Sequence, residues 1–172
     1  DLGVDVRVHP VLLPNKHPLA SVNGVFNAIF VRGNPINEAM FYGPGAGYPT
    51  ASAVISDIIE IARGIQLGSV GRFGCTCYEQ KKICPLDETT SSYFVRLLVN
   101  DEIGVLGEIA KVFGDAQVSL KSVMQTNAEV GDGAELVIIT HEVKHKNILK
   151  AEEELKKLPC VNKIFSVIRV EE

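Results

Sequence analysis

The stretch Tyr93–Ala116 constrains the fold of this chain most, because its hydrophobic period changes from that of a strand to that of a helix. Apolar residues alternate through Tyr93–Val99 and then recur at helical spacing through Val105–Phe113. The polar junction Asn100–Gly104 lies where the first helical N–H groups have no intrahelical acceptor. Such a junction favours a small anionic ligand.

The sequence that follows continues the pattern of strands and helices. Residues 118–125 and 134–143 are rich in strand formers, residues 144–158 carry an amphipathic helical stripe, and residues 160–170 predict a last strand. The order βαββαβ predicts a four-stranded antiparallel sheet with both helices on one face, a ferredoxin-like arrangement. Many unrelated functions use this order, so the order alone identifies none of them.

The composition limits the classes of protein that the chain can belong to. Hydrophobic residues make up 46% and charged residues 22% of the 172 residues, as in soluble globular proteins. The net charge of −4 argues against a nucleic-acid partner. No apolar run approaches the roughly 18 residues of a membrane span and no signal peptide opens the chain, so we expect a cytoplasmic protein without a membrane partner. The chain begins without Met, and we expect it to be a piece of a longer protein.

The first third of the chain has weaker signals. Residues 4–9 alternate as in a strand, and residues 29–42 predict a strand pair. A glycine-rich turn at residues 43–50 precedes an amphipathic helix with apolar positions over residues 54–65, for which Gly64 is the expected stop. A strand, a glycine-rich turn and a helix start can hold an anion or the polar part of a cofactor, but such turns also occur without any ligand.

Two parts of the sequence resemble known families. DEIGVLGEIAKVFGDAQVSLKSV resembles the ACT domain, a small-molecule sensor of amino-acid metabolism, and this resemblance spans residues 93–172. HPLASVNGVFNAIFVRG, FYGPGAG and PTASAVISDIIEIAR resemble the C-terminal end of the catalytic region of homoserine dehydrogenase, whose longer forms end in an ACT domain. Together they imply an α+β fragment with an incomplete α/β segment of the catalytic region at residues 1–66, a linker at 67–92 and an ACT regulatory domain at 93–172.

The resemblance to homoserine dehydrogenase implies an NAD(P)-dependent parent enzyme that interconverts L-homoserine and L-aspartate 4-semialdehyde. Gly47 matches the glycine of that family that approaches the nicotinamide, and Gly45 with Ala46 shapes the same turn. No G-x-G-x-x-G follows an expected strand, and the catalytic lysine and the acidic residues of the family lie upstream of this sequence. We therefore expect no catalytic residue, no tightly bound cofactor and no activity in this chain alone, although the choice between NAD and NADP stays open.

The resemblance to the ACT domain implies an amino-acid effector, with threonine expected first, at the junction of the first strand and the first helix. Backbone N–H groups near residues 103–105 could receive an α-carboxylate, while Asn100 or Asp101 could accept from the α-ammonium. The same residues are also ordinary helix-capping chemistry, so a helix start without a ligand is the alternative. The candidate effector-binding residues are Asn100, Asp101, Ile103, Gly104, Val105, Leu106, Val118, Ser119 and Gln125, the last three by analogy from the edge of a partner.

The expected strand at residues 134–143 carries apolar side chains on both faces. Because helices cover only one face of the predicted sheet, the second face is expected to be buried against a second ACT unit, which predicts a homodimer. Two other interpretations stay open: a stand-alone ACT-type binding or assembly module without an associated enzyme, and an intact small enzyme, which the incomplete catalytic set disfavours.

The cysteines suggest a metal site only weakly. Cys75 and Cys77 are followed by Cys84 without the paired C-x₂-C spacing of structural zinc sites, and Cys160 lies on a distant expected strand. We therefore expect reduced cysteines and no metal.

Overall fold

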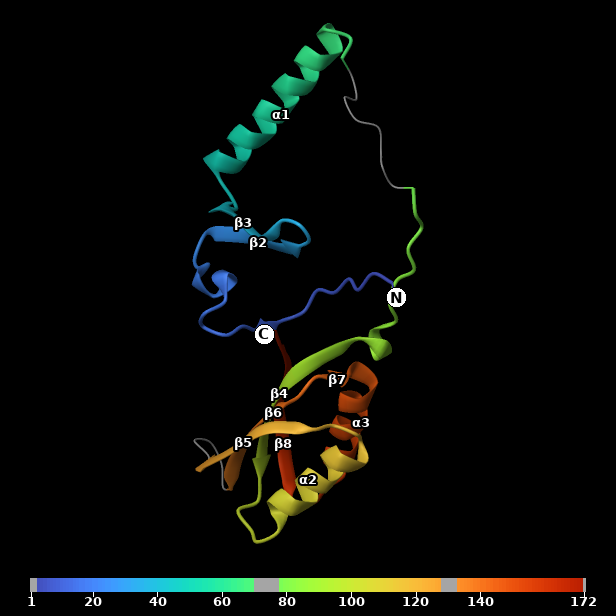
Figure 1. Ribbon diagram of the computed structural model, residues 1–172. Helices are drawn as coiled ribbons and strands as arrows, with labels where there is room; N and C mark the ends of the chain where they lie inside the picture. The colour runs from blue at the N-terminus through green and yellow to red at the C-terminus, as the bar shows by residue number, and fades with distance from the viewer. Residues whose placement is uncertain (1–2, 70–77, 128–132, 172) are drawn as a thin grey trace. The chain divides into compact units, whose positions relative to one another are not determined.

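The computed structural model describes residues 3–69, 78–127 and 133–171 (Figure 1). The chain divides into two units. We call Asp1–Leu12 with Lys81–Glu172 the sheet unit and Leu13–Gln80 the hairpin unit. Each unit is described by itself.

The sheet unit contains the predicted βαββαβ order. Its central strand is β4 (Thr90–Val99), which lies between β8 (Val161–Val170) and β6 (Ala134–Thr140), and β5 (Leu120–Asn127) pairs with the far side of β6. All three of these pairings are antiparallel. The helices are α2 (Val105–Asp115) and α3 (His145–Leu155), and Figure 1 shows both on the same side of the sheet. The predicted fold class is confirmed.

Hydrophobic periodicity explains why these segments pack as they do. Along β6, every second side chain from Ala134 to Thr140 is buried, and the side chains between them are half-buried. Each helix likewise buries a single stripe. Full burial of one such apolar side chain contributes about 1.5–3 kcal/mol, which fixes the register because a slip by one residue would turn each strand over. The largest fully buried apolar side chains are Phe113, Leu97, Ile109, Leu136, Ile138, Leu155 and Val95.

Short elements complete the sheet unit. The 3-10 helix η2 (Leu86–Glu88) precedes β4, and β7 (Val143–Lys144) pairs with the start of β4. The strand β1 (Val11–Leu12) pairs in parallel with β8 at the edge of the sheet.

The prediction of a strand over residues 4–9 is wrong. Only Val4 makes a bridge there, to Ile83, and the paired residues lie further along, at Val11–Leu12. The side chains of Val6 and Val8 are 69% and 103% exposed, so neither valine packs against an apolar surface. An alternating pattern predicts a strand only where a neighbouring strand is available.

The hairpin unit contains the predicted strand pair and helix. A 3-10 helix η1 (Pro18–Ser21) leads into the antiparallel strands β2 (Phe26–Gly33) and β3 (Asn37–Pro44), which are followed by α1 (Tyr48–Gln66). Gly64 is inside the helix and does not stop it. The chain leaves the helix through Gly68, whose φ of 65° suits a glycine at this position.

The hairpin unit leaves most of its apolar side chains uncovered. No residue of α1 is buried, and Ile55, Ile58 and Ile65 are each more than half exposed. Phe41 and Ile29 on the strands are 66% and 65% exposed. Apolar surface of this extent marks a contact with other parts of a protein.

The division into two units cuts the chain at other places than the predicted domain boundaries. Residues 3–12 and 81–92 pack with the sheet, although the prediction assigns them to a catalytic region and a linker. The boundaries 1–66, 67–92 and 93–172 stay a prediction.

Two features are absent from the described residues. The part of the chain that the structure describes has no helix that is both long and apolar enough to cross a membrane. Within the same residues, His, Cys, Asp and Glu form no group of three that could hold a metal ion. Cys75 and Cys77 lie outside the described residues. Cys84 is buried, and its thiol lies 3.5 Å from the carbonyl oxygen of Pro85.

Candidate functional site

The loop between β4 and α2 is held against the start of β8. The backbone N–H of Asn100 donates to the carbonyl of Cys160 at 2.9 Å, and Asn162 donates from its side chain to Oδ1 of Asn100 at 3.0 Å. Gly104 ends the loop with a φ of 96°, a left-handed conformation that residues with a Cβ rarely adopt. The loop thus has an anchored beginning and a turn at its end that requires glycine.

The first turn of α2 presents backbone donors without a side-chain cap. Gly104 occupies the N-cap position and has no side chain to accept from the helix, and no other side chain among the described residues caps this end. The N–H groups at the start of a helix carry a partial positive charge and favour an anion. The structure therefore retains the anion-binding potential that the sequence predicts here.

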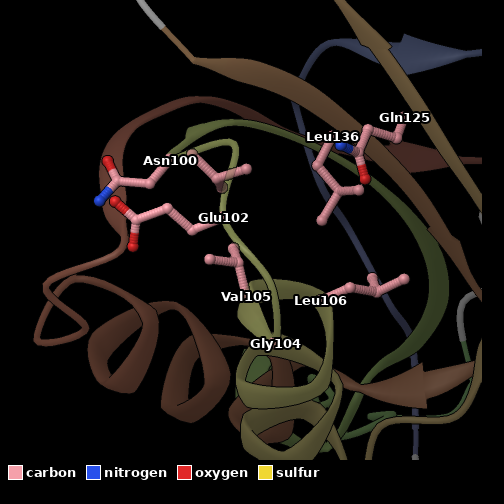
Figure 2. A pocket seen from close by; sticks show the side chains of 8 residues that line it. Asn100, Glu102, Gly104, Val105, Leu106, Gln125 and Leu136 are labelled. Carbon is pink, nitrogen blue, oxygen red and sulfur yellow. The ribbon is translucent and has the colours of Figure 1, made fainter.

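A small cavity of about 80 Å³ opens beside this loop. Its lining combines the end of β4, the loop, the first turn of α2 and residues from β5 and β6. In the view of Figure 2, Asn100 and Glu102 lie on one side and Gln125 and Leu136 on the other, with Val105 and Leu106 below. The lining residues are Val99, Asn100, Glu102, Gly104, Val105, Leu106, Gln125 and Leu136.

Five of the nine predicted effector-binding residues line this cavity. They are Asn100, Gly104, Val105, Leu106 and Gln125. Four predicted residues lie elsewhere. Asp101 is outside the lining, and its Oδ1 accepts from the side chain of Gln125 at 3.3 Å.

The remaining three predicted residues have different environments. Ile103 is fully exposed, at 107% of its reference area. Val118 is buried in the hydrophobic core, and Ser119 is exposed with its carbonyl accepting from the N–H of His141. The analogy places Val118 and Ser119 on a partner's edge, so their role stays a prediction.

Glu102 is the lining residue that the sequence analysis missed. It is the only acidic side chain in the lining that the described residues form. Its position between Asn100 and Gly104 was a usable signal, because an acidic residue in a loop before a helix can face either the helix start or the solvent. The sequence analysis names its neighbour Asp101, because sequence alone does not distinguish the two orientations.

A thiol belongs to the residue that anchors the beginning of the same loop. Burial raises the pKa of Cys160, and its contact with Glu108, 3.4 Å from the sulfur, raises the pKa further. A buried thiol that stays protonated is a poor nucleophile and a poor metal ligand. Cys160 therefore serves packing.

The predicted cofactor-binding turn joins β3 to α1. Gly45 donates its N–H to the carbonyl of Val25 at 3.0 Å, and a Cβ at this position would collide with the side chain of Asn27. Gly47 has a φ of 84° and is the N-cap of α1, where no side chain among the described residues supplies a cap. Ala46 lies between them, so the three residues form the strand–turn–helix arrangement that the sequence predicts.

Comparison with protein families gives two matches. Residues 2–59 match the homoserine dehydrogenase family, and residues 93–160 match the ACT domain.

Individual relatives agree with both matches. The chain is 40% identical over 175 residues to homoserine dehydrogenase of Neisseria gonorrhoeae, covering 98% of this chain and 40% of that protein. It is 43% identical over 171 residues to homoserine dehydrogenase of Corynebacterium glutamicum, covering 98% of this chain and 38% of that protein. The crystal structure of a homoserine dehydrogenase from Thiobacillus denitrificans matches with a TM-score of 0.87 and 28% identity, covering all of this chain and 40% of that one.

The chain thus spans about two fifths of the length of the curated relatives it matches. The matches to the family and to its members run over both units and agree with the observed fold. Over nearly its whole length the chain is therefore similar to a part of homoserine dehydrogenases, in which a segment that matches the homoserine dehydrogenase family model is followed by an ACT domain.

Proposed function

We propose that this chain is the C-terminal regulatory part of a homoserine dehydrogenase, and that its ACT domain binds an amino-acid effector in the cavity at the start of α2. The parent enzyme would interconvert L-homoserine and L-aspartate 4-semialdehyde with NAD(P), in the cytoplasm. Gly45, Ala46 and Gly47 would contribute to the cofactor site of the complete catalytic region. Homoserine dehydrogenases are the relatives over nearly the whole chain, which supports this proposal.

The observation that carries the effector proposal is the pairing of an uncapped helix start with an acidic side chain in one cavity. The N–H groups of the first turn of α2 are suited to an α-carboxylate, and the carboxylate of Glu102 is suited to an α-ammonium. Asn100 and Gln125 add polar side chains to the same lining. A zwitterionic amino acid needs both an anion site and a cation site, and threonine is the first candidate.

Isothermal titration of the chain with L-threonine tests this proposal. Glu102→Gln keeps the shape of the side chain but removes its charge, and the loss of a charge-assisted hydrogen bond is expected to weaken binding about tenfold or more. Glu153→Gln is the matched control, because Glu153 is exposed on α3 and away from the cavity. Equal affinities of the two variants, or no heat from threonine with the unaltered chain, would contradict the effector proposal.

We further propose that two copies associate through the face of the sheet opposite the helices. Phe94, Val137, Ile139 and Ile168 are half-buried on this face, and cross-strand pairing places Phe94 beside both isoleucines. An apolar face of this kind marks a protein–protein interaction site. The ACT match favours a second copy of the chain as the partner.

The same face contains an ion pair. The guanidinium of Arg96 donates to both oxygens of Glu135, each at 2.7 Å, and this interaction lowers the pKa of Glu135. Arg96 also lies over the ring of Phe165, with 5.0 Å between the guanidinium carbon and the ring centre. The charges of Arg96 and Glu135 are therefore neutralised within one chain, which favours association between copies.

Light scattering at micromolar concentration tests the dimer. Met124→Glu introduces a charge on this face at a side chain that is already 62% exposed, so the monomer is expected to fold and the dimer to dissociate. Leu149→Glu, at a 41% exposed position on α3, is the control and is expected to remain a dimer. A monomeric mass for the unaltered chain would contradict this proposal.

The proposal predicts no catalysis by the chain alone. Titration with NADPH separates the effector role from a cofactor role, and reproducible NADPH-dependent reduction of aspartate semialdehyde by the purified chain would refute the regulatory assignment.

A further inference from the structure

The segment at residues 3–12 belongs to the homoserine dehydrogenase match in sequence but to the ACT sheet in space. Val11 and Leu12 pair in parallel with Arg169 and Val170 of β8. The N–H of Glu171 donates to the carbonyl of Leu12 at 3.1 Å. The segment thus extends the four-stranded sheet by one short edge strand.

The beginning of the segment has its own backbone contacts with the sheet unit. Val4 donates its N–H to the carbonyl of Lys82 at 2.8 Å and accepts from the N–H of Cys84 at 2.9 Å. Between these two anchored ends, Val6 and Val8 are largely exposed. Backbone hydrogen bonds therefore fasten the segment at both ends, and the two valines between these ends face solvent.

Charged side chains fasten the middle of the segment. Arg7 donates to the hydroxyl of Ser91 at 3.1 Å and pairs with Asp5 at 3.0 Å. Ser91 is buried at the start of β4. This side-chain hydrogen bond joins the middle of the segment to the start of β4.

A polar cluster lies under the paired end of the segment. The hydroxyl of Tyr93 lies 2.9 Å from Nδ1 of His145, and Nη2 of Arg169 lies 3.2 Å from the same nitrogen. The guanidinium of Arg169 also stacks on the ring of Tyr93, 5.7 Å from its centre. A guanidinium can only donate, so Nδ1 of His145 must be the acceptor and the imidazole proton must be on Nε2.

Arg169 connects this cluster to the segment. Its backbone pairs with Val11, while its side chain is only 7% exposed and reaches Tyr93 and His145. Its Nη1 is buried and has no hydrogen-bond partner among the described residues. An unpaired buried donor costs free energy and offsets part of the stabilisation that the contacts of Arg169 with His145 and Tyr93 contribute, and release of the segment would let water reach this group.

We propose that residues 3–12 form a latch strand that docks reversibly on the β8 edge of the ACT sheet and is held there by the cluster of Arg169, His145 and Tyr93. The docked state gains backbone pairing and the Arg7 contacts, and the undocked state satisfies Nη1 of Arg169. Because the chain continues directly from Leu12 into the rest of the homoserine dehydrogenase match, the latch links the ACT sheet to that region. A regulatory role of the latch strand rests on the proposed function, but the docking of the latch strand on β8 does not.

Hydrogen exchange of the full chain tests the latch. The reporters are the N–H groups of Val4, Cys84 and Glu171, which hold the segment, and the references are Leu97 and Ile138 in the central strands. In Arg169→Met and His145→Ala, the reporters are expected to exchange about tenfold faster or more, because a hydrogen bond to a charged group is lost. The references are expected to keep their rates.

A conservative variant and a control separate the latch from a general loss of stability. In His145→Asn, the side-chain oxygen can take the place of Nδ1 as the acceptor, so the reporters are expected to stay protected. Arg32→Met removes an exposed arginine of the hairpin unit and is expected to change neither set. If Arg169→Met does not fold, the difference in reporter exchange rates between His145→Ala and His145→Asn tests the latch.

Two results would overturn the latch: equal acceleration of reporters and references, or unchanged reporters in both His145→Ala and Arg169→Met. The experiment contains no threonine. Its outcome is therefore independent of whether the proposed effector binds.

Discussion

Alanine at Gly104 and at Gly107 is expected to change the stability of the sheet unit in opposite directions. The two glycines lie three residues apart at the start of α2, and a Cβ added at either would meet no heavy atom within 4 Å. Steric collision therefore does not distinguish them. They differ in backbone conformation, because Gly104 has a φ of 96° and Gly107 is part of the helix.

The backbone conformations give the expected magnitudes. An L-residue in the left-handed region costs about 1–2 kcal/mol, so Gly104→Ala is expected to lower the free energy of unfolding by about that amount. Glycine within a helix is about 0.5–1 kcal/mol less favourable than alanine, so Gly107→Ala is expected to raise it by about that amount. The two variants should therefore differ by roughly 1.5–3 kcal/mol.

Urea denaturation followed at the methyl NMR signals of Ile109 and Leu97 measures this difference. Both side chains are fully buried in the sheet unit, so they report on this unit and not on the hairpin unit. The chain contains no tryptophan, which rules out the usual fluorescence probe. An equal slope of free energy against urea concentration in both variants is needed for a valid comparison.

A stabilising Gly104→Ala substitution would refute the reasoning, because it would mean that the loop can leave the left-handed conformation at no cost. Destabilisation by Gly107→Ala would be equally damaging, since it would show that the first turn of α2 requires a glycine for a reason other than conformation. Threonine titration of both variants extends the test, because Gly104 lines the cavity and Gly107 does not.

Three further predictions concern the core and the pH dependence of the sheet unit. Phe113→Ala is expected to cost about 3–5 kcal/mol in the same urea assay, because Phe113 is fully buried. Hydrogen bonds from Lys144 and Lys146 lower the pKa of Glu88 from 4.5 to about 2, so its contribution is complete above pH 4.5 and is lost as the pH falls towards 2. Glu88→Gln should remove this part of the acid dependence in urea unfolding measured across that range. Burial raises the pKa of Tyr93 from 10.0 to about 12, so folding stability should fall as the pH rises between these values, and Tyr93→Phe should flatten the fall.

The position of the cavity at the start of α2 could be predicted from the sequence because its signals are local. A change of hydrophobic period marks the end of β4 and the start of α2, and a glycine between them marks the turn. Local sequence signals do not determine whether Asp101 or Glu102 lines the cavity. The orientation of these side chains depends on how Asn100 holds the loop against β8, through a contact between residues 62 positions apart.

The order of strands and helices in the sheet unit was also determined by the sequence alone, because each element carries its own apolar period and each period specifies one buried face. Only the tertiary structure decided that residues 3–12 complete this sheet and that Arg169 is buried beside His145 and Tyr93. The physical reason is that parallel edge pairing and a buried polar cluster arise from residues far apart in the chain. Their periodicity and propensity reveal that a side chain is turned inward, but not which partner it will meet there.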